Sequence, residues 1–200
     1  MGRFRLGRMK IGLVGEDPND SNSIKNLLST STKYQHIQFK PLAQKVTGSK
    51  LKTEKLKNRL DVELSTTNFK YIIFIADLDD YDSDINKKMI KKDWFDKMNK
   101  LVNGRGIFLL NIHELEALIL SDISNFNKVF GTKLKFTGNP MMQPKPKEYL
   151  MRNTAKHPRK FKVSDCPDIF AQLDINIVAN KCGYFKEFLA TFDKKLKNAA

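Results

Sequence analysis

The stretch YIIFIADLDD, Tyr71–Asp80, decides the fold because it joins an apolar run directly to a group of carboxylates. The run Tyr71–Ala76 is rich in β-branched and aromatic residues and shows no alternation of polar and apolar positions. This pattern is typical of a strand that is buried on both faces, as in the middle of a parallel sheet. The sequence therefore predicts a central strand that ends where the acidic residues begin.

The segment near the N-terminus reads as a strand, a turn and a helix. Lys10–Gly15 is a short apolar run that ends in glycine. In the following residues, Asp17 can cap a helix, Pro18 suits the first helical position, and Asp20 places a carboxylate at the positive helix end. A strand that feeds straight into a helix is the first half of a parallel α/β unit.

Further strands and helices are expected along the chain. The segment 36–43 predicts an edge strand, because Pro41 interrupts it. Gly106–Ile112 is another candidate for a buried strand, and His113–Phe126 is expected to form a helix. Apolar residues at helical spacing predict three more helices, with Leu51, Leu56, Leu60 and Leu64 in one, Met89, Ile90, Trp94, Met98 and Leu101 in another, and Phe185, Phe188, Leu189 and Phe192 in the last.

This alternation predicts an α/β fold with a mostly parallel open sheet flanked by helices. The length of 200 residues suits a single sizeable core. We expect a basic N-terminal arm at 1–9, a core at 10–125, and a basic C-terminal extension at 126–200 that packs on the same core. The last helix is expected to pack in the core, with a docking helix for a partner protein as the alternative.

Acidic residues follow three of the expected strands. They are Glu16 after the first, Asp77 and Asp79 after the central one, and Glu114 and Glu116 after the last. In open parallel sheets the ligand site lies beyond the carboxyl ends of the strands. Neighbouring carboxylates there repel each other unless protons or a cation neutralise them, and Mg²⁺ prefers oxygen ligands. The sequence predicts a Mg²⁺ or Mn²⁺ site, with a solvated acidic loop as the alternative.

Several residues are candidates for parts of this site. The spacing of Asp77 and Asp79 points both side chains the same way if the strand continues. Asp20, Asp80 and Glu116 are candidates for extra ligands, although Asp20 also has the helix-terminal role. His113 stands three residues before Glu116, so a helix would bring both to one face, where His113 could bind metal or cap the helix.

The charge of the chain indicates a polyanionic partner. The net charge is +14 and the isoelectric point is about 9.7, which favours phosphate backbones, with solubility alone as the alternative. Basic residues dominate positions 133–162, where Glu148 is the single acid. The residues expected to contact nucleic acid are Lys145, Lys147, Arg159, Lys160 and Lys162. Phe161 among them could stack a base, and one lysine could stabilise charge at the metal site. A solubilising or partner-docking surface is the alternative.

The sequence indicates a cytoplasmic protein. No apolar run approaches the roughly 18 residues that a membrane span needs, and the N-terminus lacks the apolar core of a signal peptide. Cys166 and Cys182 lie far apart and are expected to be buried thiols with packing roles.

The order of these motifs resembles the TOPRIM domain that topoisomerases, primases and some nucleases share. The first motif of that family is a strand ending in Glu-Gly-x-x-Asp, which EDPND matches at Glu16 and Asp20, with Asp17 where glycine is usual. The second, Asp-x-Asp after an apolar strand, matches at Asp77 and Asp79. The resemblance covers about residues 10 to 120 and implies a TOPRIM-like, Rossmann-like fold. It also implies a metal-dependent phosphodiester hydrolase in which Glu16 can act as a general acid or base.

The later segments NIHELEALILSD, PKPKEYL and KFKVSDCPDIFAQLD resemble a group of small bacterial TOPRIM-like proteins, although Leu118 stands where that group usually has tryptophan. These proteins are akin to nucleases of the overcoming-lysogenisation-defect family, which often work beside an ATPase in phage defence. The resemblance implies a nuclease acting on DNA or RNA, an ATPase partner and a possible homo-oligomer. The residues it implies are Glu16, Asp77, Asp79 and Glu116 for catalysis, and Glu16, Asp20, Asp77 and Asp79 for the metal.

Two other functions stay open from the sequence. One is a TOPRIM-like module that binds nucleic acid or a partner ATPase without cutting, which the aspartate at position 17 favours. The other is a phosphotransfer enzyme that uses the acidic residues on a small substrate.

Overall fold

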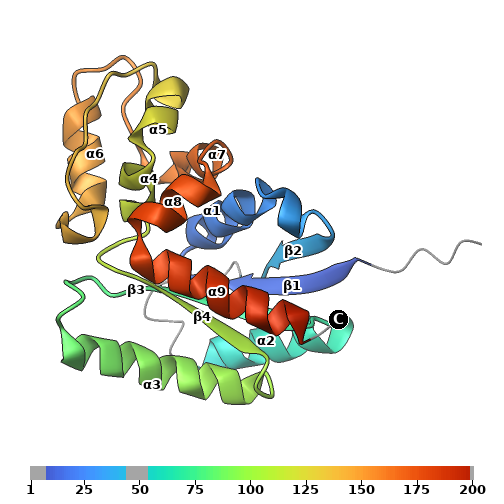
Figure 1. The fold of residues 1–200 in the computed structure, drawn as a ribbon. Coiled ribbons are helices and arrows are strands. Elements are labelled where there is room, and N and C mark those ends of the chain that lie inside the picture. The colour runs from blue at the N-terminus through green and yellow to red at the C-terminus, as the bar shows by residue number, and fades with distance from the viewer. Residues whose placement is uncertain (1–7, 44–53, 199–200) are drawn as a thin grey trace, which may run out of the picture.

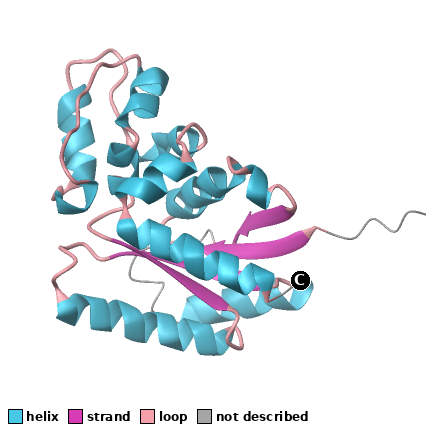
Figure 2. Cartoon of the chain, in the orientation of Figure 1, coloured by secondary structure: helices cyan, strands magenta, loops and turns pink. Residues whose placement is uncertain are grey.

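A parallel sheet forms the centre of the protein. The computed structural model describes residues 8–43 and 54–198, and in these residues the sheet contains β1 (Met9–Val14), β2 (Ile37–Pro41), β3 (Tyr71–Asp77) and β4 (Gly106–Asn111). The strand order is β2-β1-β3-β4 and every neighbouring pair is parallel. Helices flank the sheet (Figures 1 and 2). The predicted α/β class with a Rossmann-like parallel sheet is confirmed.

Strand β3 is buried on both faces, as its composition predicts. Ile73 and Ile75 belong to one apolar cluster, whereas Ile72 and Phe74 belong to the other. Successive side chains of a strand point to opposite faces, so the unbroken apolar run supplies both cores at once. The expected edge strand is also confirmed, because β2 is an outer strand of the sheet.

Each face of the sheet has its own helices. Helices α1 (Pro18–Ser29) and α9 (Gly183–Lys197) supply residues to one cluster, and α2 (Glu54–Thr66) and α3 (Ile85–Leu101) supply the other. Figure 1 shows α9 lying across one face of the sheet and α2 and α3 across the other. The predicted core role of the last helix is confirmed, since Phe185, Phe188 and Phe192 are buried.

The remaining elements are short. They are η1 (Thr32–Tyr34), α4 (Ala117–Ser121), α5 (Ile123–Phe130), η3 (Pro140–Met142), α6 (Pro146–Thr154), η4 (Val163–Asp165), α7 (Cys166–Phe170) and α8 (Ile175–Lys181). Buried residues of α4, α5, α7 and α8 join the same apolar cluster as α1 and α9. Helix α5 runs across position 125, and the separate assignment of 10–125 and 126–200 stays a prediction.

Two predictions about local structure were wrong. The helix expected at His113–Phe126 begins only at Ala117, because His113 has a φ of +60°, and it is interrupted at Asp122 before α5 begins. Phe161 is buried, so it packs in the core and does not offer a surface for a base. The helix predicted around Trp94 is confirmed as α3, in which Trp94 is buried whereas Met89 and Ile90 are exposed.

Other expectations agree with the structure. Leu56 and Leu60 are buried in α2, whereas Leu51 lies outside the described residues. Cys166 and Cys182 are buried free thiols. Over the described ranges, no helix is both long and apolar enough to span a membrane.

Candidate functional site

The turn from β1 into α1 holds the first two acidic residues in place. Asp17 accepts a hydrogen bond from the backbone N of Asn19 at 2.8 Å, and Asp20 accepts one from the backbone N of Asp17 at 2.8 Å. This capping box satisfies free N–H groups at the start of the helix. Asp20 therefore has the predicted helix-terminal role, and this role also fixes its carboxylate beside Glu16 at the end of β1.

Gly15 allows this turn to be tight. A Cβ atom at Gly15 would lie 2.8 Å from the Cβ of Asp20 and 3.0 Å from the Oγ of Ser21. The first turn of α1 is therefore packed directly on the backbone at the end of β1.

We expect Gly15→Ala to destabilise the protein by about 1 to 3 kcal/mol, because the added methyl group forces the first turn of α1 away. Urea unfolding monitored by circular dichroism measures this loss. Gly138→Ala is the matched control, since its Cβ would meet its nearest neighbour, the Cζ of Phe136, at an ordinary 3.4 Å. Equal losses in the two variants would contradict this explanation.

Asp77 ends β3 and is held by a neighbour on β4. It pairs in register with Asn111, whose Nδ2 donates to the Oδ1 of Asp77 at 2.9 Å. Asn111 is fully buried, and its own Oδ1 has no hydrogen-bond partner among the described residues. Sequence reasoning missed Asn111. The available signal was that this polar residue is the last residue of an otherwise apolar strand.

Four carboxylates come together at this edge of the sheet. We call Glu16, Asp20, Asp77 and Glu116 the carboxylate cluster. Burial, and then the charges of Asp20, Glu116 and Glu16, raise the pKa of Asp77 well above its usual value, against the effect of the Asn111 hydrogen bond. Burial is also the main cause that raises the pKa of Asp20 to about 7, with the charges of Asp17, Glu116 and Glu16 adding to it.

Glu116 brings the cluster a buried side chain from the start of α4. Burial, followed by the charge of Glu114, raises the pKa of Glu116 to about 7. The Sγ of Cys166 lies 4.0 Å from its Oε1. At neutral pH the cluster therefore holds protons that ordinary surface carboxyl groups would have lost.

Asp79 lies at the rim of the cluster. Its φ is +59° and its side chain is 63% exposed, so strand geometry stops at Asp77 and the condition for a common direction of the two side chains is not met. A connection to the cluster remains through Lys91 of α3. The Nζ of Lys91 lies 2.8 Å from the Oε1 of Glu16 and 3.7 Å from the Oδ2 of Asp79.

Sequence reasoning missed Lys91 as a residue of the site. The helix that carries Lys91 contains many lysines, and only the packing of α3 against the sheet selects this one. Lys91 is mostly buried, so its pairing with Glu16 is protected from solvent screening more than a surface pair would be.

The other acidic residues of the loop after β3 have local partners. Asp80 pairs with Lys87 at 2.7 Å, and this hydrogen bond lowers the pKa of Asp80. Asp84 caps α3 by accepting from the backbone N of Lys87 at 2.9 Å. Asp80 and Asp84 are therefore engaged in local contacts, and the candidate role of Asp80 as an extra ligand stays a prediction.

His113 and Glu116 do not share a helix face. His113 lies in the turn before α4, and its ring contacts Tyr81. Glu116 lies at the start of α4 and belongs to the carboxylate cluster. The expectation of a helical His113–Glu116 pair was therefore wrong, because the residues from His113 to Glu116 are not helical.

The expected nucleic-acid residues fall into two groups. Lys147 is bound to Glu114, with 2.9 Å between Nζ and Oε1. The guanidinium of Arg159 lies 4.3 Å from the ring centroid of Phe130 and donates to the carbonyl of Val129. Arg159 is exposed despite these contacts, and Lys145, Lys160 and Lys162 are exposed as well.

The donor set of the cluster fits a hard divalent cation in its chemistry. Carboxylate oxygens and the partnerless Oδ1 of Asn111 are the ligand type that Mg²⁺ prefers. Within the described part of the chain, however, no three acidic, histidine or cysteine side chains already converge closely enough to hold one ion. Binding would thus require side chains to turn, and Glu16 would have to leave Lys91.

Fold and site together define an α/β protein with buried carboxylates at the carboxyl ends of parallel strands. The chain belongs to the family described as "Domain of unknown function (DUF4276)", which matches residues 15–193 and so includes the whole carboxylate cluster. Comparison with curated proteins and with solved structures found no match. The resemblance to TOPRIM domains therefore stays a prediction.

Proposed function

We propose that this protein is a metal-dependent nuclease of the TOPRIM type that cleaves phosphodiester bonds in DNA or RNA in the cytoplasm. The observation that carries the proposal is the carboxylate cluster. Its members lie just after β1, in the first turn of α1, at the end of β3 and at the start of α4, and each of Asp20, Asp77 and Glu116 has a raised pKa. Buried carboxylates without countercharge are costly to the fold, and such strain is common where a ligand supplies the missing charge.

Glu16, Asp20 and Asp77 are the residues that would hold Mg²⁺ or Mn²⁺, with Asp79 reaching in from the rim. When bound, the ion would polarise a phosphoryl oxygen and lower the pKa of a water molecule. Asn111 positions Asp77 through its hydrogen bond. Glu116, with a pKa of about 7, can hold or release a proton near neutral pH, as a general acid or base must.

The charge of the chain supports a polyanionic substrate. The net charge is +14 although the cluster itself is acidic. Lys145, Lys160 and Lys162 are exposed and can contact backbone phosphates. From the resemblance alone we add that the nuclease works beside an ATPase in defence against phage.

A second candidate function is a non-catalytic TOPRIM-like module that binds nucleic acid or an ATPase. The observation that favours it is Lys91, which already neutralises Glu16 without any metal ion. This candidate predicts salt-sensitive binding that survives chelation, together with no turnover under any metal.

Incubation with plasmid, single-stranded DNA and tRNA, each with Mg²⁺, Mn²⁺ or a chelator, tests the proposal. We expect products with a metal ion and none with the chelator. Tight binding without products under any metal would contradict the nuclease and favour the binding module.

Replacing Lys91 tests whether its ammonium competes with the metal ion. We expect Lys91→Met to tighten Mg²⁺ binding by about three- to tenfold, because an ion pair of this kind contributes about 1 kcal/mol. Isothermal titration calorimetry measures the change. Lys92→Met is the control, since Lys92 pairs with Asp96 on the exposed side of the same helix. Unchanged or weaker binding in Lys91→Met would show that Lys91 does not compete.

A further inference from the structure

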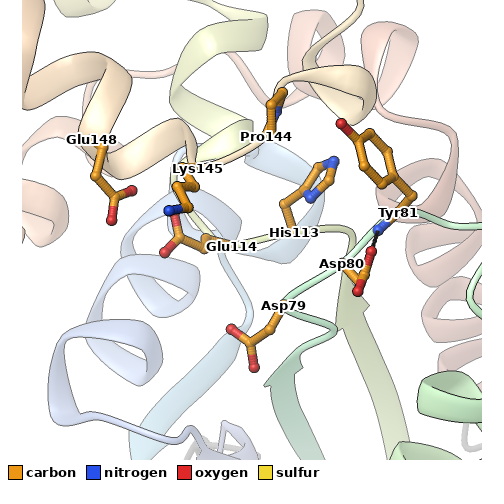
Figure 3. A pocket seen from close by; sticks show the side chains of 8 residues that line it. All are labelled: Asp79, Asp80, Tyr81, His113, Glu114, Pro144, Lys145 and Glu148. Atoms are coloured by element: carbon orange, nitrogen blue, oxygen red, sulfur yellow. Dashed lines mark hydrogen bonds between the residues drawn. The ribbon is translucent and has the colours of Figure 1, made fainter.

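A pocket lies beside the carboxylate cluster. Residues from three segments line it, namely Asp79, Asp80 and Tyr81 after β3, His113 and Glu114 after β4, and Pro144, Lys145 and Glu148 at the start of α6 (Figure 3). Its volume is about 280 Å³. Asp79 connects it to the cluster, because Lys91 lies between Asp79 and Glu16. A group in this pocket would therefore sit next to a group at the cluster.

Rings form one side of the pocket. Tyr81 and His113 meet edge to face with their centroids 4.7 Å apart, and Tyr81 is 40% exposed. Figure 3 shows the two rings and Pro144 in the upper part of the pocket and the carboxylates of Asp79 and Glu148 away from them. Flat apolar walls of this kind accept a planar ring by stacking.

His113 provides a hydrogen-bonding group without a partner. The side chain is buried, with the residue only 5% exposed, and its Nε2 has no hydrogen-bond partner within the described residues. A buried polar atom in this condition costs free energy that a hydrogen bond would recover. A ligand with a polar edge that enters the pocket would supply this bond.

The charges of the lining are mixed, because Lys145 stands among the four carboxylates of Asp79, Asp80, Glu114 and Glu148. Asp80 and Glu114 are paired with Lys87 and Lys147, respectively, but Glu148 has no ion pair in the described part of the chain. Among the described residues, the ion pair of Asp79 is the long contact to Lys91 at 3.7 Å. These two carboxylates leave the pocket rich in acceptors, which suits a neutral ligand that donates N–H groups.

The backbone around the pocket is fixed before any ligand arrives. The N of Asp79 donates to the O of His113 at 2.9 Å, and the N of His113 donates to the O of Asp80 at 3.1 Å. Asp79, His113 and Lys145 all have positive φ values, between +50° and +60°. Residues are held in this left-handed region only where the surrounding structure fixes them.

We propose that this pocket binds a nucleobase that carries an exocyclic amino group. Tyr81 stacks on the face of the base, the Nε2 of His113 bonds its polar edge, and a carboxylate of the pocket accepts a hydrogen bond from the amino group. The placement beside the reacting phosphate rests on the proposed nuclease function, whereas base binding itself does not. A strongly basic chain attracts polyanions and repels arginine-rich segments, which makes a nucleic acid a better occupant than a cationic side chain of a protein. The base can belong to a strand or to a free nucleotide.

Binding of fluorescein-labelled hexamers of dA, dC and dT by anisotropy, in EDTA and low salt, tests the proposal. Adenine and cytosine carry an amino group and thymine does not, so we expect the parent to bind dA or dC hexamers about tenfold more tightly than dT. Tyr81→Ala and His113→Asn should lose this preference, and asparagine tolerates the positive φ at 113. Met151→Ala, an exposed change on α6, should retain it.

Competition with adenosine monophosphate identifies the source of the base. If adenosine monophosphate displaces the hexamer at a concentration near the dissociation constant of the hexamer, the pocket binds a free nucleotide. If the hexamer stays bound at that concentration, the pocket binds a base within a strand. Equal binding of all three hexamers by the parent, or an unchanged preference in both Tyr81→Ala and His113→Asn, would overturn the proposal. Tyr81-dependent binding of hexa-arginine in place of the hexamers would overturn it as well.

The two proposals fail separately. A parent that cleaves nothing but keeps a Tyr81-dependent base preference refutes the nuclease and retains the pocket. A parent that cleaves with Mg²⁺ but shows no base preference refutes the pocket and retains the nuclease.

Discussion

Replacing both Asp77 and Asp79 with asparagine should abolish metal-dependent cleavage while the protein stays folded. Asn111 positions Asp77 at the centre of the carboxylate cluster, and Asp79 stands at its rim. Neutral amides are much weaker ligands for Mg²⁺ than carboxylates. Changing an outer partner of a metal ligand typically costs about 10- to 100-fold, so the loss here should exceed about 100-fold.

The two single variants, Asp77→Asn and Asp79→Asn, should lose different amounts of cleavage activity. We expect Asp77→Asn to account for most of the loss, because Asp77 feels the charges of three other cluster residues while Asp79 is largely exposed. Asp168→Asn, a change to an exposed carboxylate of α7, is the control and should cleave like the parent. Circular dichroism verifies the fold of each variant. A double variant with the parent's rate would refute the assignment of the site.

The second large effect concerns pH. Without metal, the free energy of unfolding should fall as the pH rises from about 5 to 8. The folded pKa values of Asp20 and Glu116 are about 7, above the ordinary 3.8 and 4.5. For a carboxyl group whose pKa is raised by folding, the folded form holds the proton more tightly, so its stabilisation is complete below the ordinary pKa and is lost as the pH rises through about 7.

Thermal unfolding in EDTA at pH 5, 6, 7 and 8 measures this effect. We expect Tm to fall by about 5 to 10 °C, since 1 kcal/mol corresponds to about 2 to 4 °C for a chain of this size. Mg²⁺ should restore most of the loss at pH 8, because it binds only the folded cluster. Asp77→Asn should raise Tm at pH 8 without metal and weaken the response to Mg²⁺. A Tm that is constant or rises across this range would show that the cluster is not strained.

The sheet could be predicted because its signals are local. The apolar run Tyr71–Ala76 can be buried on both faces only in the interior of a sheet, and Asp17 and Pro18 begin a helix by their own chemistry. Since carboxyl ends of parallel strands share one edge, Glu16 and Asp77 could be placed near each other from the sequence alone.

The remaining features depend on contacts that have no local signal. The positive φ values of Asp79 and His113 go with backbone hydrogen bonds from Asp79 to His113 and from His113 to Asp80, which the spacing of residues cannot show. Lys91 is one lysine among many, and only the position of α3 brings it to Glu16. Phe161 is surrounded by cations in the sequence but is buried against Phe126 and Phe130 in the fold.

Calorimetric titration of Mn²⁺ into the parent and into Asp77→Asn at pH 7.5 tests the central claim most directly. The claim is that the carboxylate cluster forms a site for a divalent cation. We predict saturable binding to the parent, with release of protons from the cluster, and a loss of this binding in Asp77→Asn. Absence of binding to the parent, or equal binding to both proteins, would contradict the claim.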